Sequence, residues 1–100
     1  MIVQIQFRGQ FKEAMLDGRK TMTCRTKRYG EVGDWFSAFD HDFSLTHVMR
    51  MQLGHVISDC FVQEGCSTPQ ELIEIWDQIH KKIGVVPEQI VWAHCFVRIT

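Results

Sequence analysis

The sequence predicts an α+β domain in which two or three helices pack against a small mixed β-barrel or curled sheet. Apolar and polar residues alternate near the N-terminus, one later segment carries an apolar stripe at helical spacing, and the last dozen residues are rich in β-branched and aromatic types. The 100 residues are enough for one domain, spanning 1–100, whose core needs neither a metal nor disulfides.

The first third of the chain is predicted to hold one strand and one helix. Residues 2–7 (IVQIQF) alternate apolar and polar side chains, as in a strand with one buried face. In residues 10–17 the apolar side chains fall on one helical face, and Gly18 is suited to end the helix. Residues 19–33 contain two glycines and are predicted to form a long loop.

A β-hairpin is predicted next. Residues 34–39 (DWFSAF) form its first strand, residues 40–42 (DHD) the turn, and residues 43–51 (FSLTHVMRM) the returning strand. In the returning strand every second residue is expected to point to the same side, namely Phe43, Leu45, His47 and Met49.

The best-defined predicted element begins at Thr68. A proline follows it, and Glu71 stands three residues after it, which is the capping-box pattern. An apolar stripe then continues at helical spacing as far as Gly84 and is expected to pack in the core. Residues 53–64 favour a short helix, and residues 89–99 a final strand. The stripe contains Leu72, Ile75, Trp76, Ile79 and Ile83.

Positive charge is concentrated in residues 8–28. That segment holds seven Lys or Arg residues and two Asp or Glu residues, although the whole chain has a formal net charge of −1. The total argues against a strongly basic nucleic-acid binder, whereas one positive face would suit an anionic ligand. The alternative is that these cations point in several directions around a loop.

The four cysteines are predicted to be small buried residues rather than ligands or disulfide partners. No two form a C-x-x-C pair, and the five histidines show no H-x-x-x-H spacing. We therefore expect no metal and no cofactor. The N-terminus does not resemble a signal peptide, and no apolar run approaches the ~20 residues that a membrane span needs. We expect a cytoplasmic protein without a membrane partner.

Residues 18–25 (GRKTMTCR) gather cations and hydroxyls. A lysine that has lost its proton could activate the hydroxyl of Thr23, in the manner of other lysine-assisted nucleophiles. In an extended segment, however, Lys20 and Thr23 face opposite sides, so they meet only if the chain bends. The alternative is a solvated basic loop without catalysis.

Three segments, taken together, resemble the ASCH domain, a relative of the RNA-binding PUA domain. They are GRKTMTCR at 18–25, YGEVGDWF at 29–36 and EGCSTPQELIEIW at 64–76. The resemblance extends from Phe7 to about Phe96 and implies a PUA-like barrel with helices against its openings. ASCH domains are proposed to bind RNA. One bacterial group of similar length is similar to N4-acetylcytidine amidohydrolase, which removes the acetyl group from the exocyclic nitrogen of the nucleoside.

The resemblance to that group implies roles for three residues. Thr23 would be the nucleophile, Lys20 the base that takes its proton, and Glu64 the acid that protonates the leaving nitrogen. We add that Arg25 could hold the developing oxyanion, or a carbonyl or phosphate of the ligand. Two further candidates for ligand contact are Arg19 and Tyr29.

Two alternatives to catalysis remain open at this point. The segment from Trp76 to His80 is closer to a wider set of short ASCH proteins, in which the Lys, Thr and Glu could simply line a nucleobase pocket. A second alternative is an RNA-binding module in which the basic loop 19–28 clamps phosphates. The expected partner is a nucleoside or single-stranded RNA. Trp35 and Trp92 could each face the barrel interior or the outside.

Overall fold

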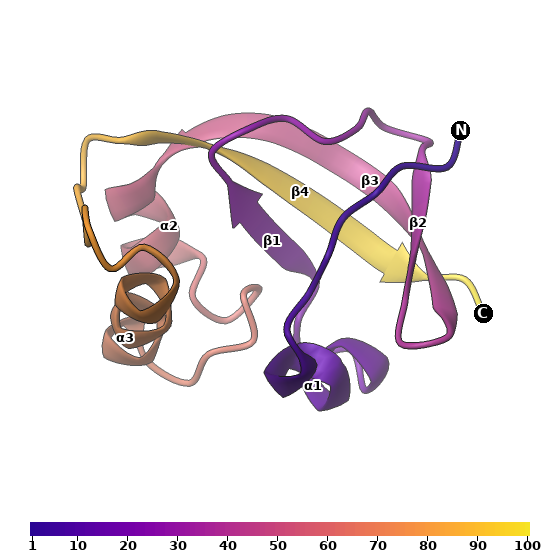
Figure 1. Cartoon of the computed structure of the whole chain (residues 1–100), viewed down its shortest axis with the longest axis horizontal. Helices are drawn as coiled ribbons and strands as arrows, with labels where there is room; N and C mark the ends of the chain where they lie inside the picture. The colour runs from indigo at the N-terminus through magenta and orange to yellow at the C-terminus, as the bar shows by residue number, and fades with distance from the viewer.

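The computed structural model describes all 100 residues and shows a curled antiparallel sheet of four strands with three α-helices (Figure 1). The order across the sheet is β1 (Met22–Arg25), β4 (Ile90–Arg98), β3 (His41–Gln52) and β2 (Trp35–Ala38). The last strand of the chain therefore lies inside the sheet, and β1 forms one edge. The predicted α+β class is confirmed, with the sheet curled into half of a barrel.

The helices gather around the edge that β1 forms. A 3₁₀ turn (Gly9–Phe11) leads into α1 (Lys12–Leu16), α2 (Leu53–Asp59) directly follows β3, and α3 (Pro69–Ile79) packs against α2. Figure 1 shows α2 and α3 together at one end of the sheet, with α1 apart from them near the start of β1. None of the helices has the length and apolar character needed to cross a membrane.

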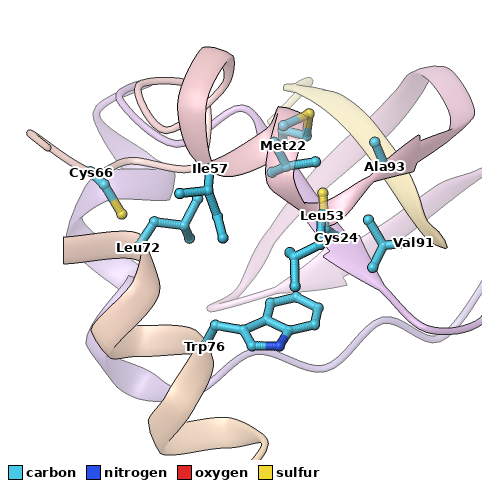
Figure 2. Packing of buried hydrophobic residues seen from close by; sticks show 10 residues of the cluster. Met22, Cys24, Leu53, Ile57, Cys66, Leu72, Trp76, Val91 and Ala93 are labelled. Atoms are coloured by element: carbon cyan, nitrogen blue, oxygen red, sulfur yellow. The ribbon is translucent and has the colours of Figure 1, made fainter. Parts of the chain in front are cut away.

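Two apolar clusters form the core. The larger one joins α2 and α3 to the sheet, and Figure 2 shows Leu72 and Trp76 of α3 pointing toward α2 and the strands. The smaller one lies under the N-terminal segment and is built around stacked and edge-on phenylalanine rings. Its buried members are Ile5, Met15, Phe36, Phe43, Leu45 and Phe96.

The strand predicted for residues 2–7 does not form. Ile2 makes one isolated parallel bridge to Trp35, after which the segment leaves the sheet. The alternation of burial is nevertheless real, because Ile5 is buried in the smaller cluster whereas Gln6 is exposed. The period-two pattern thus arises from an extended segment that packs one face on the core without a ladder of hydrogen bonds.

The prediction of one long loop over residues 19–33 is wrong in its first part, because residues 22–25 form the strand β1. This strand pairs with β4 over four residues, from Met22 opposite Cys95 to Arg25 opposite Trp92. The short helix before it ends as predicted, with Gly18 at a φ of +84°. A left-handed residue at this position is ordinary for glycine and strained for other residues.

The hairpin forms, but the position of its turn and the side to which some of its residues point differ from the prediction. Phe39 and Asp40 make the turn, both with positive φ, so it lies one residue earlier than predicted. Leu45 pairs with Phe96 and His47 pairs with the adjacent Cys95, so Thr46 is an extra residue in β3 without a partner in β4. This bulge reverses the alternation. His47 and Met49 therefore lie on the opposite face from Phe43 and Leu45, against the prediction.

The capped helix forms as predicted but is shorter. The hydroxyl of Thr68 accepts a hydrogen bond from the main-chain N–H of Glu71 at 3.1 Å, and the Glu71 carboxylate accepts one from Ser67 N–H at 3.2 Å. The helix ends at Ile79, so Ile83, predicted to lie on the apolar stripe, is 69% exposed beyond it. The short helix within residues 53–64 and the last strand are also confirmed.

Candidate active site

A cavity of about 420 Å³ lies at the open edge of β1. Four parts of the chain line it: the segment before α1, the region from Lys20 to Tyr29, the carboxyl group of Glu64, and the inner face of α3. Its volume falls in the range of about 300–1,000 Å³ that is typical of small-molecule sites. The cavity brings together most of the residues predicted to carry function.

A bulge at the start of β1 places Lys20 and Thr23 on the same side. The main-chain N–H groups of Thr21 and Met22 both donate to the carbonyl of Gln63, at 2.8 and 3.0 Å. Two successive donors on one acceptor leave an extra residue in the strand and shift its alternation by one. Lys20 and Thr23 consequently both line the cavity, whereas a regular strand would separate them.

Lys20 is held firmly in place and is only 4% exposed. Its ammonium donates hydrogen bonds to the carbonyls of Met22 at 2.9 Å and Glu64 at 3.1 Å. The same Nζ lies 3.6 Å from Oε2 of Glu64 and 4.9 Å from the centre of the Phe11 ring. One carboxylate and two carbonyls around the ammonium therefore fix the Lys20 side chain in one orientation in the wall of the cavity.

Glu64 reaches the site because the turn after α2 lies against the start of β1. Its main chain forms an isolated antiparallel bridge with Lys20, and its side chain is 9% exposed. Gly65 follows with a φ of +89°, and a Cβ at that position would lie 2.9 Å from the Cβ of Lys20. The second carboxylate oxygen, Oε1, is buried and has no hydrogen-bond partner. A buried polar atom without a partner is unusual and leaves one group available to a ligand.

Thr23 is held by a guanidinium rather than by the lysine. Nε of Arg25 donates to Thr23 Oγ1 at 3.0 Å, and a terminal nitrogen of the same group donates to the carbonyl of Gln6 at 2.6 Å. Phe7 and Tyr29 lie under and beside this guanidinium, at 4.9 and 5.9 Å. Burial lowers the pKa of Arg25, but an arginine keeps its charge in proteins. Because Thr23 accepts from Arg25, its own proton remains free for a base.

Aromatic side chains form the rest of the wall. Trp76 and His80 are stacked with ring centres 4.2 Å apart, and both line the cavity together with Phe7 and Phe11. Burial lowers the pKa of His80, and the nearby positive charges of Arg25 and Arg8 add to the effect. Flat walls of this kind suit a planar ligand.

Sequence reasoning missed most of this wall. The prediction that Trp76 packs in the core is correct, but Trp76 also lines the cavity. The signal for His80 was available, because residues four apart lie on the same side of a helix. Phe7 comes from an extended segment without a regular element, and Phe11 was predicted only to lie on the apolar face of a helix.

The other predicted contact residues divide into two groups. Tyr29 lines the cavity, and its main-chain N–H donates to Nε2 of His94 at 3.0 Å. Arg19 does not line the cavity, because its side chain turns back to Asp17 at 2.8 Å and would have to leave that carboxylate to reach a ligand. Neither Trp35 nor Trp92 lines the cavity.

No group of three or more His, Cys, Asp or Glu side chains is arranged to hold an ion. All four cysteines are free thiols, and burial, aided by the nearby Glu64 carboxylate, raises the pKa of Cys24. A thiol of this kind stays protonated and is not a nucleophile. The cavity brings together the Lys20 ammonium, the Thr23 hydroxyl and the Glu64 carboxyl, which are groups that amide hydrolysis uses, and Tyr29 and His80 line it as well.

Comparison with known proteins shows the fold and leaves the activity open. No protein-family model matches the chain, and no curated protein matches it. Among solved structures, an ASCH domain from Lactobacillus crispatus JV V101 superposes with a TM-score of 0.66 at 14% identity, over 97% of this chain and 78% of that one. Protein EF3133 from Enterococcus faecalis V583, of the family DUF984, gives a TM-score of 0.63 at 16% identity, over 90% and 67%.

A third solved structure, hypothetical protein PH0355, superposes with a TM-score of 0.67 at 12% identity, over 93% of this chain and 94% of that one. All three similarities extend over nearly the whole chain. The protein therefore has an ASCH-like fold.

Proposed function

We propose that this ASCH-like protein is an amidohydrolase that removes an acyl group from the exocyclic amine of a nucleoside, with N4-acetylcytidine as the substrate to test. The observation that carries the proposal is the placement of three buried groups, from Lys20, Thr23 and Glu64, on one cavity. The volume of that cavity suits a single nucleoside, and its aromatic wall suits a base. The expected setting, as part of the proposal, is the cytoplasm.

The reaction proceeds in two halves. In the first, Oγ1 of Thr23 attacks the acyl carbon while Nζ of Lys20 takes the hydroxyl proton. The C–N bond then breaks as Glu64 gives its proton to the leaving nitrogen, which leaves an acyl ester on Thr23 and the free amine. In the second half, water hydrolyses the ester, which releases the carboxylic acid and restores the hydroxyl.

The starting protonation state needs no proton from outside. An unprotonated Lys20 beside a protonated Glu64 differs from the ion pair by one proton moved across the 3.6 Å between Nζ and Oε2. The net charge of the pair is the same in both forms.

We propose that Arg25 acts on the nucleophile, in addition to the ligand contact predicted for it. Its guanidinium already donates to Thr23 Oγ1, so it stabilises the negative charge that develops on this oxygen as the proton leaves. The guanidinium also holds the segment before α1 through the carbonyl of Gln6, which closes one side of the cavity.

The phosphate-clamp alternative has less support. In the loop 19–28, Arg19 pairs with Asp17 and Arg28 pairs with Glu31 at 3.7 Å, which leaves Lys27 as the exposed cation without an ion pair. Arg25 is partly buried and already engaged. A basic clamp needs cations that are free to meet phosphates, so single-stranded RNA is the secondary prediction.

The test is to incubate the purified protein with N4-acetylcytidine and to follow cytidine release by chromatography. Thr23→Val, Lys20→Met and Glu64→Gln keep approximate shape and should each lower kcat/KM at least 10²-fold. Thr46→Val is the matched control, since it removes a threonine hydroxyl from β3, away from the cavity. It should retain wild-type turnover.

Two results would count against the proposal. Wild-type protein that releases no cytidine at high concentration is not an amidohydrolase for this nucleoside. Tight binding of RNA, with an affinity that falls steeply as salt rises, would favour the phosphate-binding alternative.

A further inference from the structure

The outer edge of β1 carries hydrogen-bonding groups that no neighbouring strand uses. The strand pairs with β4 on one side only, and on its other side the cavity begins. In an antiparallel pair, successive residues direct their main-chain N–H and C=O alternately toward the partner strand and away from it. The question is which residues of β1 face the cavity with these groups.

The hydrogen bonds at the start of β1 settle the alternation. The N–H of Phe96 donates to the carbonyl of Thr21, so this carbonyl faces β4, whereas the Thr21 N–H donates outward to Gln63 as part of the bulge. Met22 faces outward, because its N–H donates to Gln63 and its carbonyl accepts from Lys20 Nζ. Two residues later the pattern repeats, and the N–H and C=O of Cys24 point outward as well.

Cys24 lines the cavity with its outward main-chain groups on that side, and its thiol lies near the Glu64 carboxylate. Its side chain packs in the larger apolar cluster with Leu53 and Trp76, yet the residue also lines the cavity. Along the strand its outward groups lie about 7 Å from those of Met22, where the Lys20 ammonium is held. The N–H of Cys24 is the nearer of its two outward groups to Thr23, which directly precedes it.

We propose that the main-chain N–H of Cys24 binds the acyl oxygen of the substrate and stabilises the oxyanion that forms when Thr23 attacks. This inference rests on the proposed hydrolysis. As the Thr23 Oγ1–carbon bond forms, the π electrons of the acyl C=O move onto its oxygen. A fixed N–H on the residue after the nucleophile is well placed to donate a hydrogen bond to this negatively charged oxygen. Arg25, the other candidate, is occupied by Thr23 and Gln6.

Proline at position 24 tests this directly. It deletes the N–H, and an edge strand tolerates proline where the N–H does not bond to the neighbouring strand. Cys24→Ala is the reference variant, because it loses the thiol but keeps the N–H. Cys24→Pro should show a kcat 10²–10³-fold below that of Cys24→Ala, the loss expected for one oxyanion donor, with a KM similar to that of the Ala variant.

The outcomes separate the two proposals. Equal kcat in the Pro and Ala variants overturns the role of Cys24 and leaves the proposed hydrolysis intact. A wild-type protein without hydrolysis overturns the proposed function and this role with it. Circular dichroism of both variants shows whether the Pro variant is folded.

A second measurement serves if the Pro variant does not fold. Protein labelled with ¹⁵N-cysteine and ¹⁵N-tryptophan has four cysteine amide signals, each assignable by a Cys→Ser variant, and tryptophan indole signals that report binding. In the inactive Thr23→Val background, N4-acetylcytidine should move the Cys24 amide proton downfield and leave that of Cys60 in place. Binding detected at the tryptophan indole signals without a shift at Cys24 overturns the inference. Cytidine, which lacks the acyl oxygen, should not cause the shift.

Discussion

Lys20 and Glu64 are joined three times: by an isolated antiparallel bridge between their main chains, by a hydrogen bond of 3.1 Å from Nζ to the Glu64 carbonyl, and by a contact of 3.6 Å between Nζ and Oε2. The bridge fixes the turn after α2 to the first strand, and the side-chain contact fills the space between them. The same two residues thus connect distant parts of the chain and supply two of the three proposed catalytic groups.

The first prediction concerns the energy of this pair. Either Lys20→Met or Glu64→Gln should cost about 3–5 kcal/mol, because each leaves a buried polar partner uncompensated. The double variant should cost much less than the sum of the two. Urea unfolding of the four proteins gives the coupling free energy. Additive costs would mean that the two side chains do not stabilise each other.

The second prediction concerns Gly65. Gly65→Ala combines a positive φ with a Cβ only 2.9 Å from the Cβ of Lys20. Gly33→Ala is the matched control, since its φ of +93° is similar but no atom lies within 4 Å. Backbone strain should lower the free energy of unfolding of each variant by about 1–3 kcal/mol. Only Gly65→Ala should also lose hydrolysis, because the new Cβ forces Lys20 to move. Similar stability and activity in the two variants would show that Lys20 tolerates the contact.

The third prediction is a loss of stability in acid. Burial lowers the pKa of His94, whose Nε2 accepts from the N–H of Tyr29 and must therefore be unprotonated. Below the ordinary histidine pKa of about 6.5, the unfolded chain binds a proton that the folded chain resists, so the free energy of unfolding falls as pH decreases through this range.

The variant that checks this third prediction is His94→Gln, whose amide oxygen can accept from Tyr29 but does not titrate. Urea unfolding at pH 8 and pH 5.5 should show a smaller pH dependence in this variant than in wild type. Part of the dependence should remain, because the pKa of His80 is also lowered. His47→Gln, at an exposed site on β3, should leave the wild-type difference unchanged.

The fourth prediction concerns the start of α3. Thr68→Ala removes the hydroxyl that accepts from Glu71 N–H and should lower the free energy of unfolding by about 1 kcal/mol. Thr68→Ser keeps an equivalent oxygen and should cost far less. Thermal unfolding followed by circular dichroism compares the two. A loss in the Ser variant as large as that in the Ala variant would assign the effect to the methyl group.

The sequence predicted those elements in which local signals and tertiary packing agree. The start of α3 followed from a capping residue, a proline and Glu71, and the hairpin followed from alternation. Two of the errors in the prediction come from one residue inserted in a strand. The extra residue before His47 reverses a face, and the paired donors to Gln63 turn Lys20 toward the cavity. Such bulges depend on the partner strand, which local patterns do not describe.

The candidate site was predictable in its polar groups and unpredictable in its walls. Lys20, Thr23 and Glu64 belong to motifs that resemble a known family, and the structure places all three on one cavity. The orientation of Arg25 depends on the carbonyl of Gln6, which comes from a segment predicted to be a strand. Long-range contacts of this kind require the fold itself.

The interior position of β4 has a consequence for synthesis on the ribosome. Both β1 and β3 pair with this strand, yet its residues, 90–98, are translated after every other element. Until these residues have left the exit tunnel, β1 has no partner strand to align it. The strands β1 and β3 are therefore joined into one sheet only after residues 90–98 have emerged, which makes their pairing a late step of folding.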